Sequence, residues 1–119
     1  VVTTRSVRPE YVAYLRKVRI PFILAGDTAI DLPAALDKLY SLFGIRRFAI
    51  VGGATINARF IQENLVDEIR LVVAPFIDGS KELTITEMPD NTRLTKAFAL
   101  DRVERLEHDG ILIIYKRNK

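Results

Sequence analysis

The sequence lacks cysteine and contains a single histidine, His108, among its 119 residues. Without cysteine the chain can form neither a disulfide nor a thiolate metal site, so we expect a cytoplasmic protein with no bound metal. His108 stands beside Asp109-Gly110, a pair typical of hairpin turns. We therefore expect His108 to be an exposed turn residue and not a catalytic base.

Long apolar runs and basic clusters are also scarce. No stretch approaches the roughly 20 apolar residues of a membrane-spanning helix, and no basic leader precedes the first predicted strand, so we expect no membrane association. The 18 lysines and arginines are interspersed with 15 acidic residues, which leaves a net charge of +3. Because they form no stripe with interleaved aromatic residues, we expect no nucleic-acid binding. A basic chain suits a phosphorylated small-molecule ligand.

What remains is the composition of one globular domain spanning residues 1–119, with 49% hydrophobic and 28% charged residues. Short apolar runs alternate with segments of helical spacing along the chain. This order predicts an α/β fold with a mostly parallel sheet flanked by helices and closed by a C-terminal antiparallel hairpin. Strands are predicted at residues 1–4, 20–25, 48–51, 69–74, 94–106 and 111–115, and helices at residues 9–19, 32–43 and 54–65.

The helix predicted at residues 32–43 has the clearest boundaries. Asp31 is expected to cap its first turn, which also contains Pro33, and Gly44 is expected to end it. Leucines and a phenylalanine recur on one side of this helix at helical spacing, which indicates a core-facing surface.

The segment Arg46–Phe60, RRFAIVGGATINARF, organises the prediction of function. An apolar run turns through Gly52-Gly53 directly into a helix, an arrangement that leaves free backbone N–H groups and the positive end of the helix dipole at one place. Such a place suits a phosphate. The spacing matches neither the dinucleotide fingerprint nor a P-loop, so two glycines that merely permit a tight turn remain the alternative.

A second candidate site follows the first predicted strand. Thr4, Arg5 and Ser6 come directly after the β-branched run at the start of the chain. In an open α/β sheet the carboxyl ends of the strands face the ligand crevice, so these residues are candidates for binding a phosphate. A solvated connection between strand and helix is the alternative reading.

Taken in order, these segments resemble the second half of the dihydrofolate-reductase-like fold. More narrowly, they resemble the reductase domain of the riboflavin-biosynthesis pyrimidine deaminase/reductase and its stand-alone relatives. The resemblance covers nearly the whole chain and implies a three-layer α/β/α architecture. The residues that carry it are Asp31-Leu32, Phe43-Gly44-Ile45, Val51-Gly52-Gly53, Leu65-Val66-Asp67-Glu68, Pro75 and Asp78-Gly79.

The resemblance implies an NADPH-dependent reductase similar to 5-amino-6-(5-phosphoribosylamino)uracil reductase, which reduces the ribosyl group of an aminopyrimidine ribose phosphate. It also implies a homodimer. Thr4, Arg5 and Ser6 match the position where this fold holds the adenosine 2′-phosphate, in keeping with the hydroxyls and guanidinium found there. The residues matched to the pyrophosphate and nicotinamide side of the cofactor are Gly52, Gly53, Ala54, Thr55, Ile56 and Asn57.

Two departures from the family pattern limit what the resemblance implies. Val51 stands at a substrate-contacting position where many pathway reductases have glutamate. The family's first half has no counterpart here, so we expect a portion of a longer reductase and assign no catalytic residue. The alternatives are a non-catalytic nucleotide-binding or dimerisation module of the same fold, and a dihydrofolate-reductase-like enzyme with another substrate.

Overall fold

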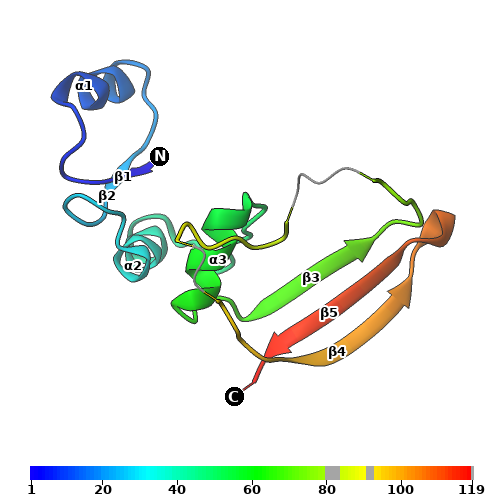
Figure 1. The fold of residues 1–119 in the computed structure, drawn as a ribbon. Coiled ribbons are helices and arrows are strands. Elements are labelled where there is room, and N and C mark those ends of the chain that lie inside the picture. Colours follow the sequence, from blue (N-terminus) through cyan, green and yellow to red (C-terminus); the bar gives the residue numbers. More distant parts are fainter. Residues whose placement is uncertain (80–83, 91–92, 119) are drawn as a thin grey trace. The chain divides into compact units, whose positions relative to one another are not determined.

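A computed structural model describes residues 1–79, 84–90 and 93–118 (Figure 1). The chain divides into two compact units, Val1–Ala49 and Ile50–Lys119. The first unit contains helices α1 and α2 with a small sheet, and the second contains helix α3 with a larger one. No helix in the described ranges is both long enough and apolar enough to cross a membrane.

The first unit is built around a pair of short parallel strands. β1 (Val2–Thr3) and β2 (Ile23–Leu24) pair in parallel, and α1 (Pro9–Lys17) connects them. Both strands were predicted, but each is shorter than expected. Pairing begins beyond Pro21, which has no N–H to donate to a sheet. Ile23, Ala25 and Ala35 form the buried core, against which Val2, Ile30 and Leu39 pack.

Helix α2 (Leu32–Phe43) confirms the clearest prediction of the sequence. The carboxylate of Asp31 accepts a hydrogen bond from the backbone N–H of Ala34 at 2.9 Å, so the helix begins with a side-chain cap. Gly44 ends it with a φ of 66°, in the left-handed region that favours glycine. The ammonium group of Lys38 donates to the carbonyl of Leu24 and so ties α2 to β2.

The second unit contains α3 (Ala54–Gln62) and a three-stranded sheet in the order β3-β5-β4. Both pairings in that sheet are antiparallel. β4 (Phe98–Arg105) and β5 (Ile111–Arg117) are joined by the 3-10 turn η1 (Glu107–Asp109). The predicted C-terminal hairpin is therefore confirmed. β3 (Glu68–Val73) pairs along its whole length with β5.

The structure differs from the predicted sheet in two respects. Residues 48–51 form no strand, and the side chains of Phe48 and Val51 are 53% and 95% exposed. A strand needs a neighbouring strand to accept its backbone hydrogen bonds, and this segment belongs to neither of the two sheets in the described part of the chain. The sheet is also not mostly parallel in the part of the chain that the structure describes, since β1 and β2 are the parallel pair and β3 pairs antiparallel with β5.

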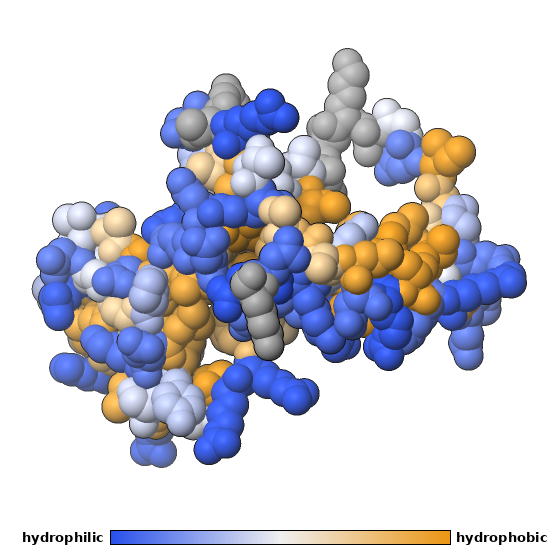
Figure 2. Space-filling model, turned by 90° about the horizontal axis from the view of Figure 1, so that it is seen from below, coloured by the Kyte–Doolittle hydropathy of each residue, from blue (hydrophilic) through white to orange (hydrophobic). Residues whose placement is uncertain are grey.

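The sheet β3-β5-β4 has one apolar and one charged face. Directly paired residues of neighbouring strands point to the same side. Seen from the side on which β4 lies, Figure 2 shows orange atoms along one side of the sheet region and blue atoms along the other. By strand register, the apolar face also carries Arg105, opposite Ile111, and its apolar residues are Ile69, Leu71, Val73, Leu100, Val103, Ile111, Ile113 and Tyr115.

The charged face has a buried residue, Ile114, at its centre. Ile114 lies between Arg70 and Arg102 in the strand register and is only 1% exposed. Arg70 pairs with Glu68 and Arg102 with Glu104, each at 2.6 Å. The hydrogen bond and charge of Glu68 raise the pKa of Arg70. The side chains of Arg70 and Arg102 are themselves 65% and 57% exposed.

Candidate functional site

The ends of β1 and β2 bring together the first set of predicted residues. Because the strands are parallel, their carboxyl ends lie at the same edge. The hydroxyl groups of Thr4 and Ser6 are hydrogen-bonded at 2.9 Å. The backbone N–H groups of Arg5 and Ser6 donate to the carbonyls of Gly26 and Asp27, both at 3.0 Å. Two hydroxyls and a guanidinium are thus gathered on one stretch of backbone that the neighbouring strand end supports.

The guanidinium of Arg5 has an acidic partner that the sequence did not reveal. Its Nη1 lies 2.8 Å from Oδ1 of Asp27. The two side chains are 67% and 80% exposed, so both can be reached from solvent. The pair links the first strand end to the second, and any anion that binds Arg5 meets the Asp27 carboxylate as well.

The second set of predicted residues surrounds the N-terminus of α3. Gly52 has a φ of 105°, which favours glycine, and the peptide bond between Gly52 and Gly53 is cis. Gly53 is the N-cap residue, and no side chain caps the helix there. Ala54, Thr55 and Ile56 form the first turn of the helix. The first i to i−4 hydrogen bond of the helix is donated by the N–H of Asn57 to the carbonyl of Gly53, so the N–H groups of these three residues have no partner of that kind within the helix.

The space in front of this helix is open. A Cβ atom placed on Gly53 would find no heavy atom within 4 Å, and one placed on Gly52 would find only the Asn57 amide nitrogen, at 4.0 Å. Gly53 and Thr55 are exposed, and Ile56 is half exposed. Among the described residues, the two glycines before the first turn therefore have open space beside them.

Asn57, which is predicted to contact the cofactor, also forms a hydrogen bond within the protein. Its amide nitrogen donates to the carbonyl of Ile85 at 2.8 Å. The N–H of Glu87 donates to the carbonyl of Ala54 at 3.2 Å. These bonds hold residues 84–87 beside the first turn of α3. The two segments are far apart in the sequence, and no sequence pattern predicted this contact.

The two sets of predicted residues lie in different units. Thr4, Arg5 and Ser6 belong to Val1–Ala49, whereas Gly52 to Asn57 belong to Ile50–Lys119. The structure therefore defines each half of the expected cofactor site within its own unit. Val51, the expected substrate contact, directly precedes Gly52 and is almost fully exposed.

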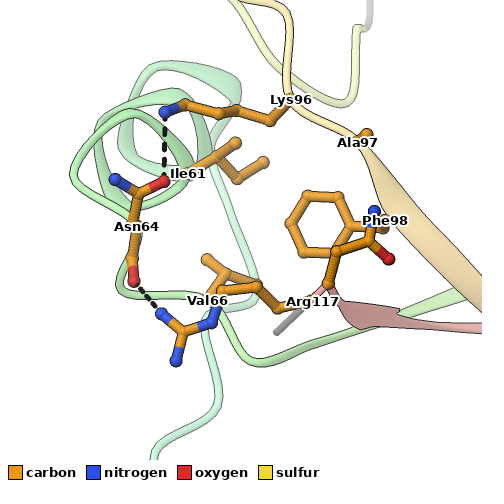
Figure 3. Close-up of a pocket in the computed structure, with 8 residues that line it drawn as sticks. Ile61, Asn64, Val66, Lys96, Ala97, Phe98 and Arg117 are labelled. Carbon is orange, nitrogen blue, oxygen red and sulfur yellow. Dashed lines mark hydrogen bonds between the residues drawn. The ribbon is translucent and has the colours of Figure 1, made fainter.

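A pocket of about 470 Å³ lies at the other end of α3 and was not predicted (Figure 3). Lys96 donates to the side-chain oxygen of Asn64 at 3.0 Å, and Arg117 donates to the Asn64 carbonyl and to Asp67. Because these cations are already engaged, the pocket serves here as a junction between α3 and the sheet. Its lining residues are Ile61, Asn64, Val66, Lys96, Ala97, Phe98, Arg117 and Asn118.

The described residues offer no obvious acid, base or metal centre. His108 is exposed in η1, where its φ is 57°, as expected for a turn residue. No group of three or more His, Cys, Asp or Glu side chains in the described ranges is placed to hold a metal ion. The chemistry available at the two candidate sites is the binding of anions by backbone amides, hydroxyls and a guanidinium.

Comparison with known proteins shows the family of the chain. The family model described as the RibD C-terminal domain matches residues 1–112. The chain is 38% identical over 98 residues to the 2,5-diamino-6-ribosylamino-4(3H)-pyrimidinone 5′-phosphate reductase of Methanothermobacter thermautotrophicus, covering 76% of this chain and 44% of that protein. It is 32% identical over 120 residues to the reductase of the same name from Archaeoglobus fulgidus, covering 100% of this chain and 52% of that one.

Among solved structures, the chain is similar to a pyrimidine reductase-like protein from Corynebacterium diphtheriae, with a TM-score of 0.81 and 20% identity. That match covers 99% of this chain and 49% of the other, and it supports the α/β fold. The chain thus spans about half the length of the proteins it matches. With the family model matching almost all of its residues, the chain belongs to the RibD C-terminal domain family.

Proposed function

We propose that this chain is the cofactor-binding part of an NADPH-dependent reductase of the riboflavin-biosynthesis type. The family match over residues 1–112 carries this proposal. The substrate class is an aminopyrimidine ribose phosphate, since two relatives are named as reductases of such a compound. The whole reductase adopts the three-layer dihydrofolate-reductase-like fold, with residues 1–119 in one domain.

The residues present fit the cofactor at both ends. Bound NADPH supplies the hydride for reduction of the ribosyl group. The guanidinium of Arg5 and the hydroxyls of Thr4 and Ser6 suit the adenosine 2′-phosphate as hydrogen-bond donors. One hydroxyl donates to the other in this structure, and it would turn to a phosphate oxygen when the cofactor binds. The open space at Gly53 suits the diphosphate, which the dipole and free amides of the α3 first turn favour.

The remaining residues of the second set have supporting roles in this proposal. Ala54, Thr55 and Ile56 supply the backbone amides of the first turn. Asn57 holds residues 84–87 in place through Ile85 and keeps its side-chain oxygen for the nicotinamide side of the cofactor. Val51 borders the substrate.

A second candidate function is a non-catalytic nucleotide-binding module. Val51 favours it, because an exposed valine has no group that can hold a polar substrate. Both functions use the same cofactor site, so they differ in turnover and not in NADPH binding. A reductase of the same fold with another substrate is the remaining option. In each case we expect a cytoplasmic protein that binds neither membrane nor nucleic acid.

The test is a fluorescence titration of the chain with NADPH and with NADH, in the wild type and in Arg5→Ala. A reductase with a 2′-phosphate site binds NADPH more tightly, and removing the guanidinium abolishes that preference. We expect the variant to lose about tenfold in NADPH affinity, since a charge-assisted hydrogen bond contributes about 1.5 kcal/mol or more. Failure of the wild type to bind either nucleotide would refute the proposal for this chain.

We also propose that the protein forms a homodimer through the apolar face of the sheet. Leu100 and Val103 on this face are 59% and 54% exposed, and Val73 is 42% exposed. Exposed apolar surface of this extent is typical of an interface. A second copy suits it, because an identical apolar face offers a self-complementary surface across a two-fold axis.

Light scattering on the purified chain tests the dimer. Val103→Lys places a charge on the apolar face and should convert dimer to monomer at micromolar concentration. Val72→Lys is the matched control: Val72 is 62% exposed on β3, and its register with Leu112 and Glu104 places it on the charged face. Equal effects of the two variants, or a monomeric wild type, would contradict the proposed interface.

A further inference from the structure

The ion pair between Arg5 and Asp27 joins opposite charges at the place where the proposed function puts the 2′-phosphate. The carboxylate oxygen of Asp27 lies 2.8 Å from the guanidinium, and both side chains are mostly exposed. A phosphate that approaches Arg5 must therefore displace this carboxylate or share the guanidinium with it. It also experiences the repulsion of the Asp27 charge at short range.

The position of Asp27 does not depend on the ion pair. Its backbone carbonyl accepts a hydrogen bond from the N–H of Ser6. The preceding Gly26 has a φ of 84°, and a Cβ atom there would lie 2.0 Å from the carbonyl oxygen of Ala29. The N–H of Asp31 donates to the carbonyl of Ala25 and closes the same turn. The backbone thus holds Asp27 at the strand end, beside Arg5.

The same carboxylate suits a nucleotide that lacks the 2′-phosphate. A carboxylate accepts hydrogen bonds, and an acidic residue beyond a strand end of an α/β sheet commonly binds the 2′-hydroxyl of an adenosine ribose. Arg5 and Asp27 therefore present two recognition groups side by side: a cation for a 2′-phosphate and an anion for a 2′-hydroxyl.

We propose that Asp27 is a specificity-determining residue that limits the preference of this site for NADPH over NADH. This inference rests on the proposed function, because it assumes that the adenosine ribose binds at the ends of β1 and β2. Asp27 weakens binding of the 2′-phosphate by occupying Arg5 and strengthens binding of the 2′-hydroxyl. The wild-type site accordingly accepts both cofactors, with a modest preference for NADPH.

The test uses 2′,5′-ADP and 5′-AMP as probes, because they differ only in the 2′-phosphate. Calorimetric titration of the full chain gives the ratio of their affinities for the wild type, Asp27→Asn and Arg5→Ala. Asp27→Asn removes the charge at nearly constant shape and keeps the backbone bond to Ser6. We expect it to raise the ratio about two- to fivefold, the size of one exposed ion pair, and Arg5→Ala to lower it.

A matched control separates this effect from a general change in charge. Asp109 forms an ion pair with Arg105 of similar exposure in the hairpin of the second unit. Asp109→Asn makes the same change in net charge and should leave the ratio unaltered. An equal rise in Asp109→Asn, or an unchanged ratio in Asp27→Asn, would overturn the role of Asp27 while the proposed function stands. Absence of binding by either probe to the wild type would overturn both.

Discussion

Helices α2 and α3 begin in opposite ways. The first turn of α2 is closed by the protein itself, since the carboxylate of Asp31 accepts from the N–H of Ala34. The first turn of α3 follows Gly53, has no side-chain cap, and faces open space. Among the described residues, a side chain thus caps the N-terminal amides of α2, and none caps those of α3.

Under the proposed function, the difference separates a structural helix start from one that binds the cofactor. A glycine N-cap forgoes roughly a few tenths of a kcal/mol of the stability that serine or aspartate would provide. A side-chain carboxylate at that point would occupy the amides and repel a diphosphate. Glycine at position 53 therefore suits a helix whose acceptor is a ligand, and aspartate at position 31 suits a helix that is only part of the core.

The largest expected effect, on NADPH affinity, comes from giving α3 the same kind of side-chain cap that α2 has. Gly53→Asp gives α3 the cap that α2 has. We expect NADPH affinity to fall about tenfold or more, because repulsion between a carboxylate and a phosphate about 4 Å apart is worth about 1 to 4 kcal/mol near a protein surface. The stability of the fold should rise by about 0.5 kcal/mol or less. Fluorescence titration and urea denaturation measure the two quantities.

Gly53→Ala is the matched control for this variant. Gly53 has a φ of −73°, which alanine adopts freely, and its added methyl group would touch no heavy atom within 4 Å. Urea denaturation should therefore detect a change of about 0.5 kcal/mol or less. Affinity should fall by less than in Gly53→Asp, since the methyl group adds bulk without charge. If Gly53→Asp binds NADPH as tightly as the wild type, the α3 N-terminus is not the diphosphate site.

The sequence predicted the elements whose determinants are local. The cap at Asp31 and the left-handed Gly44 lie within the segment that forms α2, so the helix boundaries could be read from a few neighbouring residues. The hairpin between β4 and β5 was predicted for the same reason, from the turn at Asp109-Gly110.

Elements that depend on distant partners were predicted less well. Residues 48–51 have the composition of a strand, but strand formation depends on a place in a sheet, and this segment lies outside both sheets of the described residues. The Arg5–Asp27 pair and the bond from Asn57 to Ile85 join residues 22 and 28 positions apart. Neither leaves a periodic signal. The pocket shown in Figure 3 draws its lining from several separate segments for the same reason.

The smaller expected effect comes from removing the side-chain cap of α2, so that its first turn becomes uncapped like that of α3. Asp31→Ala removes the acceptor for the Ala34 N–H and should lower the free energy of unfolding by about 1 kcal/mol, measured by urea denaturation. NADPH affinity should stay unchanged, because this cap serves the core helix. Asp31→Asn keeps an oxygen acceptor and should stay within about 0.5 kcal/mol of the wild type. If Asp31→Ala weakened NADPH binding as strongly as Gly53→Asp, a closed and an open helix start would serve the same purpose, and the distinction between structural and ligand-binding termini would not hold for this protein.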